Sequence, residues 1–443
     1  MFANPLGLYP DPQITTFKGQ YILIGTDTLS GARAISLHTA PTLAQLPNAT
    51  RHVVYTPPAT GPECCELWAP ELHRIGEGDA ARWYIYFAAD DGNNNNHRMY
   101  ALESAGDDPL GPYTNKGKVA DSADDRWAID ATVLQLDGKL YFIWSGWKAD
   151  VNGQQSLFIA PMSNPWTISG PRVLLTEPTL AWEMSGMPIN EGPAVLQHDG
   201  KTYLTYSANG CWTNDYQLGL LTFNGGDPLN PAAWTKTAQP VFTDVAGVFS
   251  PGHNSFFKSP DGKDDWIVYH AQDNQVGGCG GDRTARAQKI SWNADGTPNL
   301  GQPVAAGEFL AAPSGEVSAE LPTRYEAELA LVRNARIIDV ATASGGKMVA
   351  YIETPASLVQ FSVLVSVAGA YTMTVHYSNS LDEDAEQKAT VNHQPAVALA
   401  YPPSGGRESV KPVTMTVNLQ AGGNTIQFAP GAKPARLDFI EIQ

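Results

Sequence analysis

Long apolar runs and basic charge are both scarce in this sequence, and each shortage excludes a class of protein. No stretch of roughly eighteen or more apolar residues occurs, so no membrane-spanning helix is expected. Only 16% of the residues are charged, and 45 acidic residues outnumber 28 basic ones, which gives a net charge of −17. A phosphate backbone would repel such a chain, so we expect neither a nucleic acid nor a membrane as partner.

Cysteine is also rare, with only Cys64, Cys65, Cys211 and Cys279 present. None of them lies in a CxxC pair, so a zinc-finger site is not expected. A bond between the adjacent Cys64 and Cys65 would require a strained ring. A bridge from Cys211 to Cys279 could join two loops in an oxidising compartment, and four free thiols are an equal alternative.

Glycine and proline, in contrast, are abundant, with 41 and 33 residues in a chain of 443. This composition is typical of many short strands joined by turns, so we predict an all-β protein. The chain is longer than a single hydrophobic core usually supports, so we predict two domains.

One motif recurs five times at steps of roughly sixty residues, within the range of repeat architectures such as propellers. In each copy a polar or ionisable residue opens a short apolar run, and a turn then leads into an aromatic-rich strand. The copies are PDPQI with Asp11, WAPELH with Glu71, AIDATVL with Asp130, NEGPAVL with Glu191 and PGHNSFF with His253. We interpret these five residues as equivalents at the entrance of an inner strand, where they would converge if the copies surround an axis.

The repeat predicts a five-bladed β-propeller over residues 1–312, with one four-stranded blade from each copy. A linker rich in Pro, Ser, Ala and Gly is expected over 313–324. Over 325–443 tryptophan disappears, and short β-branched runs alternate with glycine turns. This second part is predicted to be a β-sandwich of the jelly-roll type.

Several acids that meet at one axis suit glycoside hydrolysis. One carboxylic acid protonates the leaving oxygen, and a carboxylate activates water or attacks carbon. The candidates are Asp11, Asp130, Glu191 and Glu71. Each acid taken singly is more often a turn cap than a catalyst. As a matched set they favour catalysis, because mutual repulsion would keep one of them protonated.

Together with the run DRTARAQKISW, the motifs resemble glycoside hydrolase family 43 over residues 4 to about 305. Within that family they are similar to the exo-acting α-L-arabinofuranosidases of α-1,5-arabinan. The resemblance implies that Asp11 is the general base and Glu191 the general acid. It also implies that Asp130 raises the pKa of the general acid and orients it.

The same resemblance implies a substrate arginine and a cation. The arginine falls on Arg283, with Arg286 as the competitor. His253 matches an imidazole that meets a central cation, usually calcium. The implied mechanism is single-step inversion, for which the two working carboxyl groups should lie roughly 6.5–9.5 Å apart.

Aromatic side chains near the motif acids are candidates for pocket walls. Trp68 and Trp182 are our predicted walls. Trp127 and Trp147 also follow the motifs closely, but tryptophan in propeller strands commonly packs between blades.

The C-terminal part resembles the jelly-roll carbohydrate-binding modules of families 6 and 35, through YEAELA, SGGKMVAYIE, LQAGGNTIQF and ARLDFIEI. The resemblance implies a structural calcium held by Glu326, Glu328 and Asp438, which are oxygen donors of the type calcium prefers. The part has no Trp platform for sugar, and one loop brings Lys433 and Arg436 instead. The C-terminal part could therefore have a purely structural role or could recognise charged uronic acids.

The first hypothesis for function is an inverting α-L-arabinofuranosidase that releases terminal arabinose from arabinan or arabinoxylan. A β-xylosidase or an endo-arabinanase of the same family, and a non-catalytic glycan-binding propeller, are the alternatives. The expected partner is an arabinose-containing plant polysaccharide or oligosaccharide, and the chain is expected to be a monomer. We expect secretion or a periplasmic location, although the start MFANPLGLYPDP has no signal-peptide pattern.

Overall fold

The computed structural model describes residues 1–275, 279–280, 282–317 and 319–443. Strands and short 3-10 helices make up its regular structure, which confirms the predicted all-β class. The 3-10 helices are η1 (Thr28–Ser30), η2 (Leu43–Asn48), η3 (Gly78–Ala80), η4 (Asn94–Asn96), η5 (Ala181–Glu183), η6 (Pro231–Ala233), η7 (Ala327–Leu329) and η8 (Ser344–Gly346). Across the described residues, none of these helices has the length and apolar character needed to cross a bilayer.

The chain divides into two compact units. The larger unit consists of Tyr9–Thr39 and Thr50–Pro303, and the smaller one of Met1–Leu8, Ala40–Ala49 and Val304–Gln443. This division falls before the predicted linker at 313–324, of which residue 318 lies outside the described residues. The domain limits 1–312 and 325–443 stay predictions.

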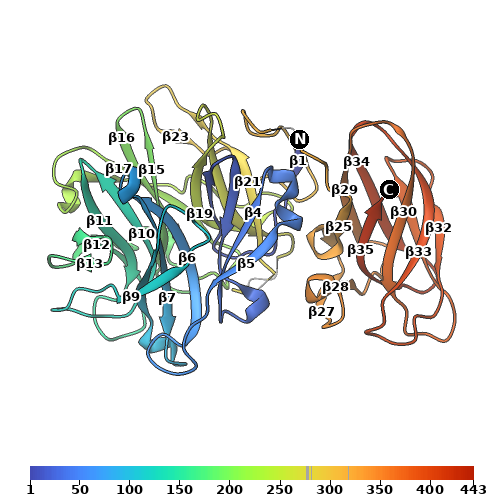
Figure 1. The fold of residues 1–443 in the computed structure, drawn as a ribbon, viewed down its shortest axis with the longest axis horizontal. Helices are drawn as coiled ribbons and strands as arrows, with labels where there is room; N and C mark the ends of the chain where they lie inside the picture. The colour runs from blue at the N-terminus through green and yellow to red at the C-terminus, as the bar shows by residue number, and fades with distance from the viewer. Residues whose placement is uncertain (276–278, 281, 318) are drawn as a thin grey trace. The chain divides into compact units, whose positions relative to one another are not determined.

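Within its described residues, the larger unit contains five consecutive antiparallel sheets of three or more strands, drawn from blue to yellow in Figure 1. The first two sheets are β2 (Gln13–Phe17), β3 (Gln20–Ile24), β4 (Ile35–Ala40) and β5 (Thr50–Tyr55), then β6 (Cys65–Ile75), β7 (Arg82–Asp90), β8 (Arg98–Ser104) and β9 (Tyr113–Lys118). The third sheet is β10 (Ala128–Leu136), β11 (Lys139–Gly146), β12 (Ser156–Asn164), β13 (Thr167–Ile168) and β14 (Val173–Thr176). The last two are β15 (Asn190–His198), β16 (Lys201–Ala208), β17 (Gln217–Phe223) and β18 (Trp234–Lys236), then β19 (Phe249–Lys258), β20 (Asp265–Gln272) and β21 (Thr284–Lys289). Two short pairs complete the strands before residue 313, namely β22 (Ser291–Trp292) with β23 (Pro298–Asn299) and β1 (Phe2–Ala3) with β24 (Phe309–Leu310).

Local sequence explains why each copy folds into a hairpin. Strand β10 is buried along nearly its whole length, as its continuous apolar run predicts for a strand covered on both faces. The turn that follows has Asp137 and Gly138 both at positive φ, 51° and 72°, and Asp199 and Gly200 repeat this geometry after β15. Asp-Gly is the residue pair that such left-handed hairpin turns favour.

The first strands of the five sheets surround a common space. They contact one another in the order β2, β6, β10, β15 and β19, and β19 contacts β2. Residues from all five strands line one cavity of about 330 Å³, among them Gln13, Glu71, Thr132, Gln197 and Ser255. The motif residues at the starts of these strands are therefore brought close together.

Besides the β1–β24 pair, the described residues of the smaller unit form two larger antiparallel sheets, labelled in orange and red in Figure 1. One sheet comprises β27 (Arg336–Asp339), β28 (Lys347–Ala350), β35 (Arg436–Ile442), β30 (Gly369–Ser378) and β33 (Lys411–Leu419), with β25 (Arg324–Glu326) paired to β35. The other comprises β26 (Leu331–Arg333), β29 (Leu358–Val365), β34 (Gly422–Pro430), β31 (Ala385–Val391) and β32 (Val397–Tyr401). Side chains of both sheets, such as Val375 and Phe428, belong to one buried apolar cluster.

Candidate active site

Asp11 is the most heavily paired of the predicted acids. Its Oδ1 accepts a hydrogen bond from Arg283 Nη1 at 2.8 Å, and its Oδ2 accepts one from Thr26 Oγ1 at 2.6 Å. Nδ1 of His253 and Nδ1 of His270 lie 3.2 and 3.4 Å from the same Oδ1. Burial would raise the pKa of Asp11, but Arg283 and the two histidines hold it well below its usual range. The Asp11 side chain is therefore a carboxylate at neutral pH.

Glu191 is buried as deeply but has fewer cationic neighbours. The Tyr216 hydroxyl donates to Glu191 Oε1 at 2.9 Å. Burial is the main cause that raises the pKa of Glu191 to about 7, and the charge of Asp11 adds to it. The Tyr216 hydrogen bond and Arg283 act in the opposite direction. A carboxyl group with this pKa can hold a proton at neutral pH and give it up.

Asp130 lies close enough to Glu191 to feel its charge. Asp130 Oδ2 accepts a hydrogen bond from the Gly192 backbone N–H at 3.2 Å, and His253 Nδ1 lies 3.9 Å from the same oxygen. Burial first, and then the charges of Glu191 and Asp11, raise the pKa of Asp130 well above its usual range. The Asp130 carboxyl group therefore holds a proton more tightly than an ordinary aspartate does.

Three of the motif residues share an unusual backbone conformation, which determines the direction of their side chains. Asp11, Asp130 and His253 have positive φ values of 57°, 55° and 44°, which non-glycine residues rarely adopt. In β10 and β19 this residue lies within a β-bulge, where the pairing register shifts. A bulge bends its strand and re-aims side chains, and bulges are frequent beside active sites.

The interpretation of all five motif residues as equivalents is wrong for two of them. In β15 the left-handed position is Gly192 at 53°, so Glu191 comes one residue earlier. In β6 it is Ala69 at 42°, so Glu71 comes two residues later. Gly192 also leaves little space for a side chain, because a Cβ atom there would lie 3.1 Å from the His253 ring.

Glu71 lies among the residues that line the inner cavity, and its Oε2 is 2.7 Å from Nε2 of His73. Its charge still acts at the site, since it contributes to the raised pKa of Asp130.

The two arginine candidates lie in different surroundings. Arg283 donates to Asp11, and it also donates from Nε to Gly280 O and from Nη2 to Cys279 O, each at 3.1 Å. Arg286 is completely buried, and its Nη2 lies 2.5 Å from Asp273 Oδ1. Of the two, it is Arg283 whose guanidinium lies against the acids.

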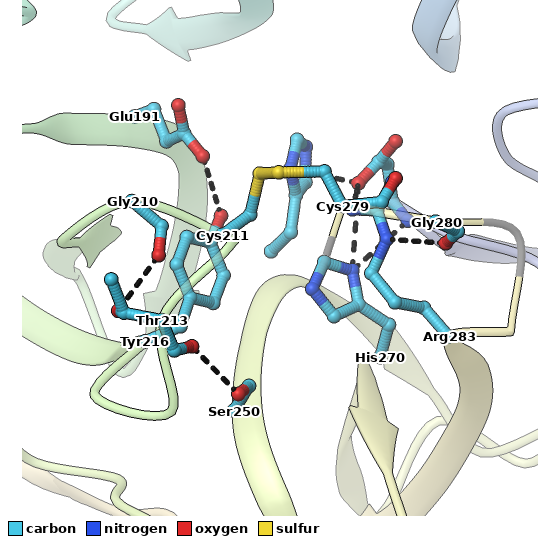
Figure 2. The surroundings of a disulfide bond; sticks show 12 residues. Glu191, Gly210, Cys211, Thr213, Tyr216, Ser250, His270, Cys279, Gly280 and Arg283 are labelled. Atoms are coloured by element: carbon cyan, nitrogen blue, oxygen red, sulfur yellow. Dashed lines mark hydrogen bonds and ion pairs between the residues drawn. A yellow bond between two sulfur atoms is a disulfide. The ribbon is translucent and has the colours of Figure 1, made fainter. Parts of the chain in front are cut away.

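A disulfide joins the loop before Arg283 to the loop before Tyr216. Cys211 and Cys279 are bonded across 68 residues of sequence. Figure 2 shows Tyr216 and Glu191 on one side of this bond and Arg283 and His270 on the other. The disulfide therefore links the partner of the proposed acid to the partner of Asp11.

The adjacent pair Cys64 and Cys65 is also bonded. The alternative of four free thiols is therefore wrong, and adjacency does not prevent a bond.

Two site residues were missed by sequence reasoning. His270 Nδ1 accepts a hydrogen bond from the Asp11 backbone N–H at 3.2 Å, and burial is the main reason its pKa falls to about 3. Tyr216 stacks on the His270 ring, with centroids 5.5 Å apart. The only available signal was an imidazole within the otherwise apolar run WIVYHA.

Each of the two predicted pocket walls stacks on a neighbouring aromatic ring. Trp68 stacks on His97 with centroids 4.0 Å apart. Trp182 stacks on Tyr206 at 6.3 Å, and its Nε1 donates to Ala238 O at 3.1 Å. Both indoles are half-buried and keep part of their surface exposed.

Trp127 and Trp147 stack on each other at 4.8 Å with nearly parallel rings, and both are buried in an apolar cluster. Both side chains therefore serve packing, as expected for tryptophan in a propeller, rather than forming a pocket wall.

In the smaller unit, the three predicted metal ligands come from β25, η7 and β35. Glu326 Oε1 accepts from Arg324 Nε and Ser344 Oγ, and Asp438 Oδ1 accepts from the Ser344 backbone N–H. Oε2 of Glu326 and Oε2 of Glu328 are buried and have no hydrogen-bond partner. Burial, together with the charge of Glu326, raises the pKa of Asp438 to about 7 and that of Glu328 well above its usual range.

Known proteins similar to this chain were found by sequence and by structure. A sequence model of the family described as Glycosyl hydrolases family 43 matches residues 2–298. An "Extracellular exo-alpha-(1->5)-L-arabinofuranosidase" from Streptomyces avermitilis is 42% identical over 69% of this chain and 64% of its own length. A protein of the same name from Streptomyces chartreusis is 37% identical over 61% of this chain and 82% of its own length.

Among solved structures, an alpha-L-arabinofuranosidase from Lactobacillus brevis aligns with a TM-score of 0.64 and 35% identity. The alignment covers 70% of this chain and 98% of that one. The chain spans less than two thirds of the length of the Streptomyces avermitilis relative, at 64%.

Proposed function

Because this chain belongs to glycosyl hydrolase family 43, we propose that it is an inverting, exo-acting α-L-arabinofuranosidase. Its substrate is then a terminal arabinose of arabinan or arabinoxylan. The single observation that carries the proposal is the opposite displacement of two buried pKa values, downward for Asp11 and upward for Glu191. A glycosidase needs one carboxylate and one carboxylic acid at the same pH.

In the proposed reaction Asp11 is the general base. Its carboxylate accepts a proton from a water molecule, and the water oxygen attacks the anomeric carbon. Glu191 gives its proton to the departing glycosidic oxygen as the C–O bond breaks. Asp130 acts on Glu191 as a positioning residue and keeps its proton affinity high. Arg283 binds the substrate and keeps Asp11 ionised.

We propose that Trp68 and Trp182 contribute walls to the arabinose pocket. Both rings are held by stacking while part of their surface is exposed. A rigid, partly exposed aromatic face is well suited to pack against a sugar ring.

We further propose that the five sheets of the larger unit are the blades of a five-bladed propeller. Support comes from the circular contacts of their first strands and from the cavity that all five line. The two sheets of the smaller unit, which share one core, are proposed to form the jelly roll of a carbohydrate-binding module of the family 6 and 35 type.

Calcium is proposed at two places. In the smaller unit, the unpartnered Oε2 atoms of Glu326 and Glu328, with Asp438 nearby, are donors that suit a hard cation. In the larger unit, His253 is the proposed partner of the cation. Glu71, whose charge acts on His253, and Ser255 offer oxygen donors at the inner cavity. A bound cation would fix the strands that carry these residues and offset their negative charge.

We propose that the protein acts outside the cytoplasm, either secreted or periplasmic, and as a monomer. Two disulfides support an oxidising compartment. The names of the two Streptomyces relatives support the same location.

A product assay tests the function. The protein is incubated with debranched arabinan, arabinoxylan and xylo-oligosaccharides, and the products are separated by anion-exchange chromatography. Monomeric arabinose from arabinan or arabinoxylan is expected, and proton NMR should show an inverted anomer as the first product. Oligomeric arabinan products would favour an endo-arabinanase, and xylose would favour a β-xylosidase. No product from any substrate would favour a glycan-binding protein.

A further inference from the structure

Three side chains of the second sheet form a compact group of nitrogen and oxygen donors, which we call the His97 cluster. Glu66 lies in β6, Asp90 ends β7, and His97 follows η4. One ligand atom of each side chain lies within 4.8 Å of the other two. Asp90 and His97 are completely buried, whereas Glu66 is exposed and opens the cluster to solvent.

The His97 ring is oriented so that one nitrogen faces the acids. Nε2 lies 3.1 Å from the Glu66 backbone oxygen, a suitable acceptor for an N–H. Nδ1 faces two oxygens, Asn94 O at 3.2 Å and Asp90 Oδ2 at 3.4 Å. A neutral imidazole has only one N–H, so a lone pair on Nδ1 would face oxygen atoms directly. Metal-ligating histidines adopt this arrangement, with the other ring nitrogen donating to a backbone carbonyl.

Asp90 has one carboxylate oxygen satisfied and one not. Oδ1 accepts from the Gly92 backbone N–H at 2.9 Å, while Oδ2 is buried without a hydrogen-bond donor. Such an atom is costly unless a cation compensates it. The 3.4 Å from Oδ2 to His97 Nδ1 is long for a hydrogen bond. It equals the edge of a tetrahedron whose two metal–ligand bonds are each about 2.1 Å, as in zinc sites.

The third member adds a like charge. Glu66 brings a second carboxylate close to Asp90 and His97. Two carboxylates that repel each other beside an imidazole lone pair form a site that a divalent cation would stabilise.

We propose that Glu66, Asp90 and His97 bind a divalent metal ion of the zinc class, with solvent as a fourth ligand. The site is separate from the proposed catalytic acids and does not take part in the hydrolysis. Its ion fixes the His97 ring, on which the predicted pocket wall Trp68 stacks at 4.0 Å. Metal binding is therefore coupled to the orientation of that wall.

Zinc titration tests the proposal directly. The full chain is stripped with a chelator, dialysed and titrated with zinc chloride in a calorimeter, and its bound zinc is measured by elemental analysis. One zinc per chain is expected in the wild type. Loss of a ligand should weaken binding by at least about 100-fold, more than the 10- to 100-fold typical of residues behind the ligands. His97→Gln and Glu66→Gln are the test variants, and the exposed Glu66 is the one whose replacement should leave folding intact.

Three controls separate this site from others. His52→Gln replaces a histidine of β5 outside the cluster, and Asp79→Asn replaces an exposed acid of η3; both should bind zinc as the wild type does. His253→Gln should also retain the zinc, which excludes the acids around Asp11 as the source. Cobalt(II) bound in place of zinc should give the strong visible absorption of tetrahedral coordination, and this band should vanish in His97→Gln.

Two results would overturn the proposal. Wild-type protein that binds no zinc would mean that the three side chains of the His97 cluster do not form a metal site. Zinc stoichiometry and affinity unchanged in both His97→Gln and Glu66→Gln would place the metal elsewhere.

Discussion

The hydrogen bond from Tyr216 to Glu191 offers a sharp test of how the proposed acid is tuned. Tyr216→Phe removes the donor that lies 2.9 Å from Glu191 Oε1 and keeps the ring. The stacking of that ring on His270, with planes 14° apart, should persist. The substitution therefore changes one interaction with Glu191 and little of the packing around it.

The magnitude follows from the charge of the acceptor. A hydrogen bond contributes about 1.5–3 kcal/mol to a charged partner and about 0.5–1.5 kcal/mol to a neutral one. Tyr216 therefore favours ionised over protonated Glu191 by about 1–1.5 kcal/mol, and one pKa unit corresponds to about 1.4 kcal/mol. Loss of the bond should raise the pKa of Glu191 from about 7 by roughly one unit. Because a general acid works in its protonated form, activity should extend to higher pH.

The assay is the pH profile of kcat/KM on an arabino-oligosaccharide, whose leaving group needs protonation. The alkaline limb should move up by about one unit. The acid limb should stay, because Arg283 and two histidines set the pKa of Asp11. Tyr203→Phe is the control, since its hydroxyl donates to Gly296 O instead. A folded Tyr216→Phe enzyme with an unmoved or lowered alkaline limb would refute the proposed role of Tyr216.

Four further changes probe the same site and the smaller unit. Glu191→Ala should abolish release from oligosaccharides but spare an activated aryl arabinofuranoside, and equal losses would argue against the acid role. Asp130→Asn removes a like charge beside Glu191, so the alkaline limb should move down; an unmoved limb would exclude this coupling. Replacing both Cys211 and Cys279 by serine should cost about 2–4 kcal/mol in urea unfolding and lower kcat/KM, because Tyr216 and Arg283 lose a common restraint; unchanged kcat/KM would remove that role. Chelation should lower the melting temperature of the wild type more than that of Glu328→Gln, and equal shifts would exclude Glu328 as a ligand.

Much of the fold follows from the sequence because its signals are local. Continuous apolar runs such as the one around Val133 predict buried inner strands, and the Asp137–Gly138 pair predicts the hairpin turn after it. Both features are present where they were expected. The position of Asp11 was also predictable, since its motif leads directly into β2, the inner strand of the first sheet.

The register of the motif residues could not be predicted. In the five copies the left-handed position is held by Asp, Ala, Asp, Gly and His, so no residue type marks it. A bulge shifts the pairing by one residue, and the sequence pattern on either side is the same with or without it. For this reason Glu191 and Glu71 were assigned to a position that Gly192 and Ala69 occupy.

The different roles proposed for Asp11 and Glu191 depend on their neighbouring side chains rather than on burial. Burial raises the pKa of both Asp11 and Glu191, so it cannot by itself make one a base and the other an acid. Asp11 receives a guanidinium and lies beside two imidazoles, whereas Glu191 receives one phenol and faces the charge of Asp11. Asp11 therefore stays ionised, and its charge adds to the effect of burial that raises the pKa of Glu191, while Arg283 lowers the pKa of both carboxyl groups.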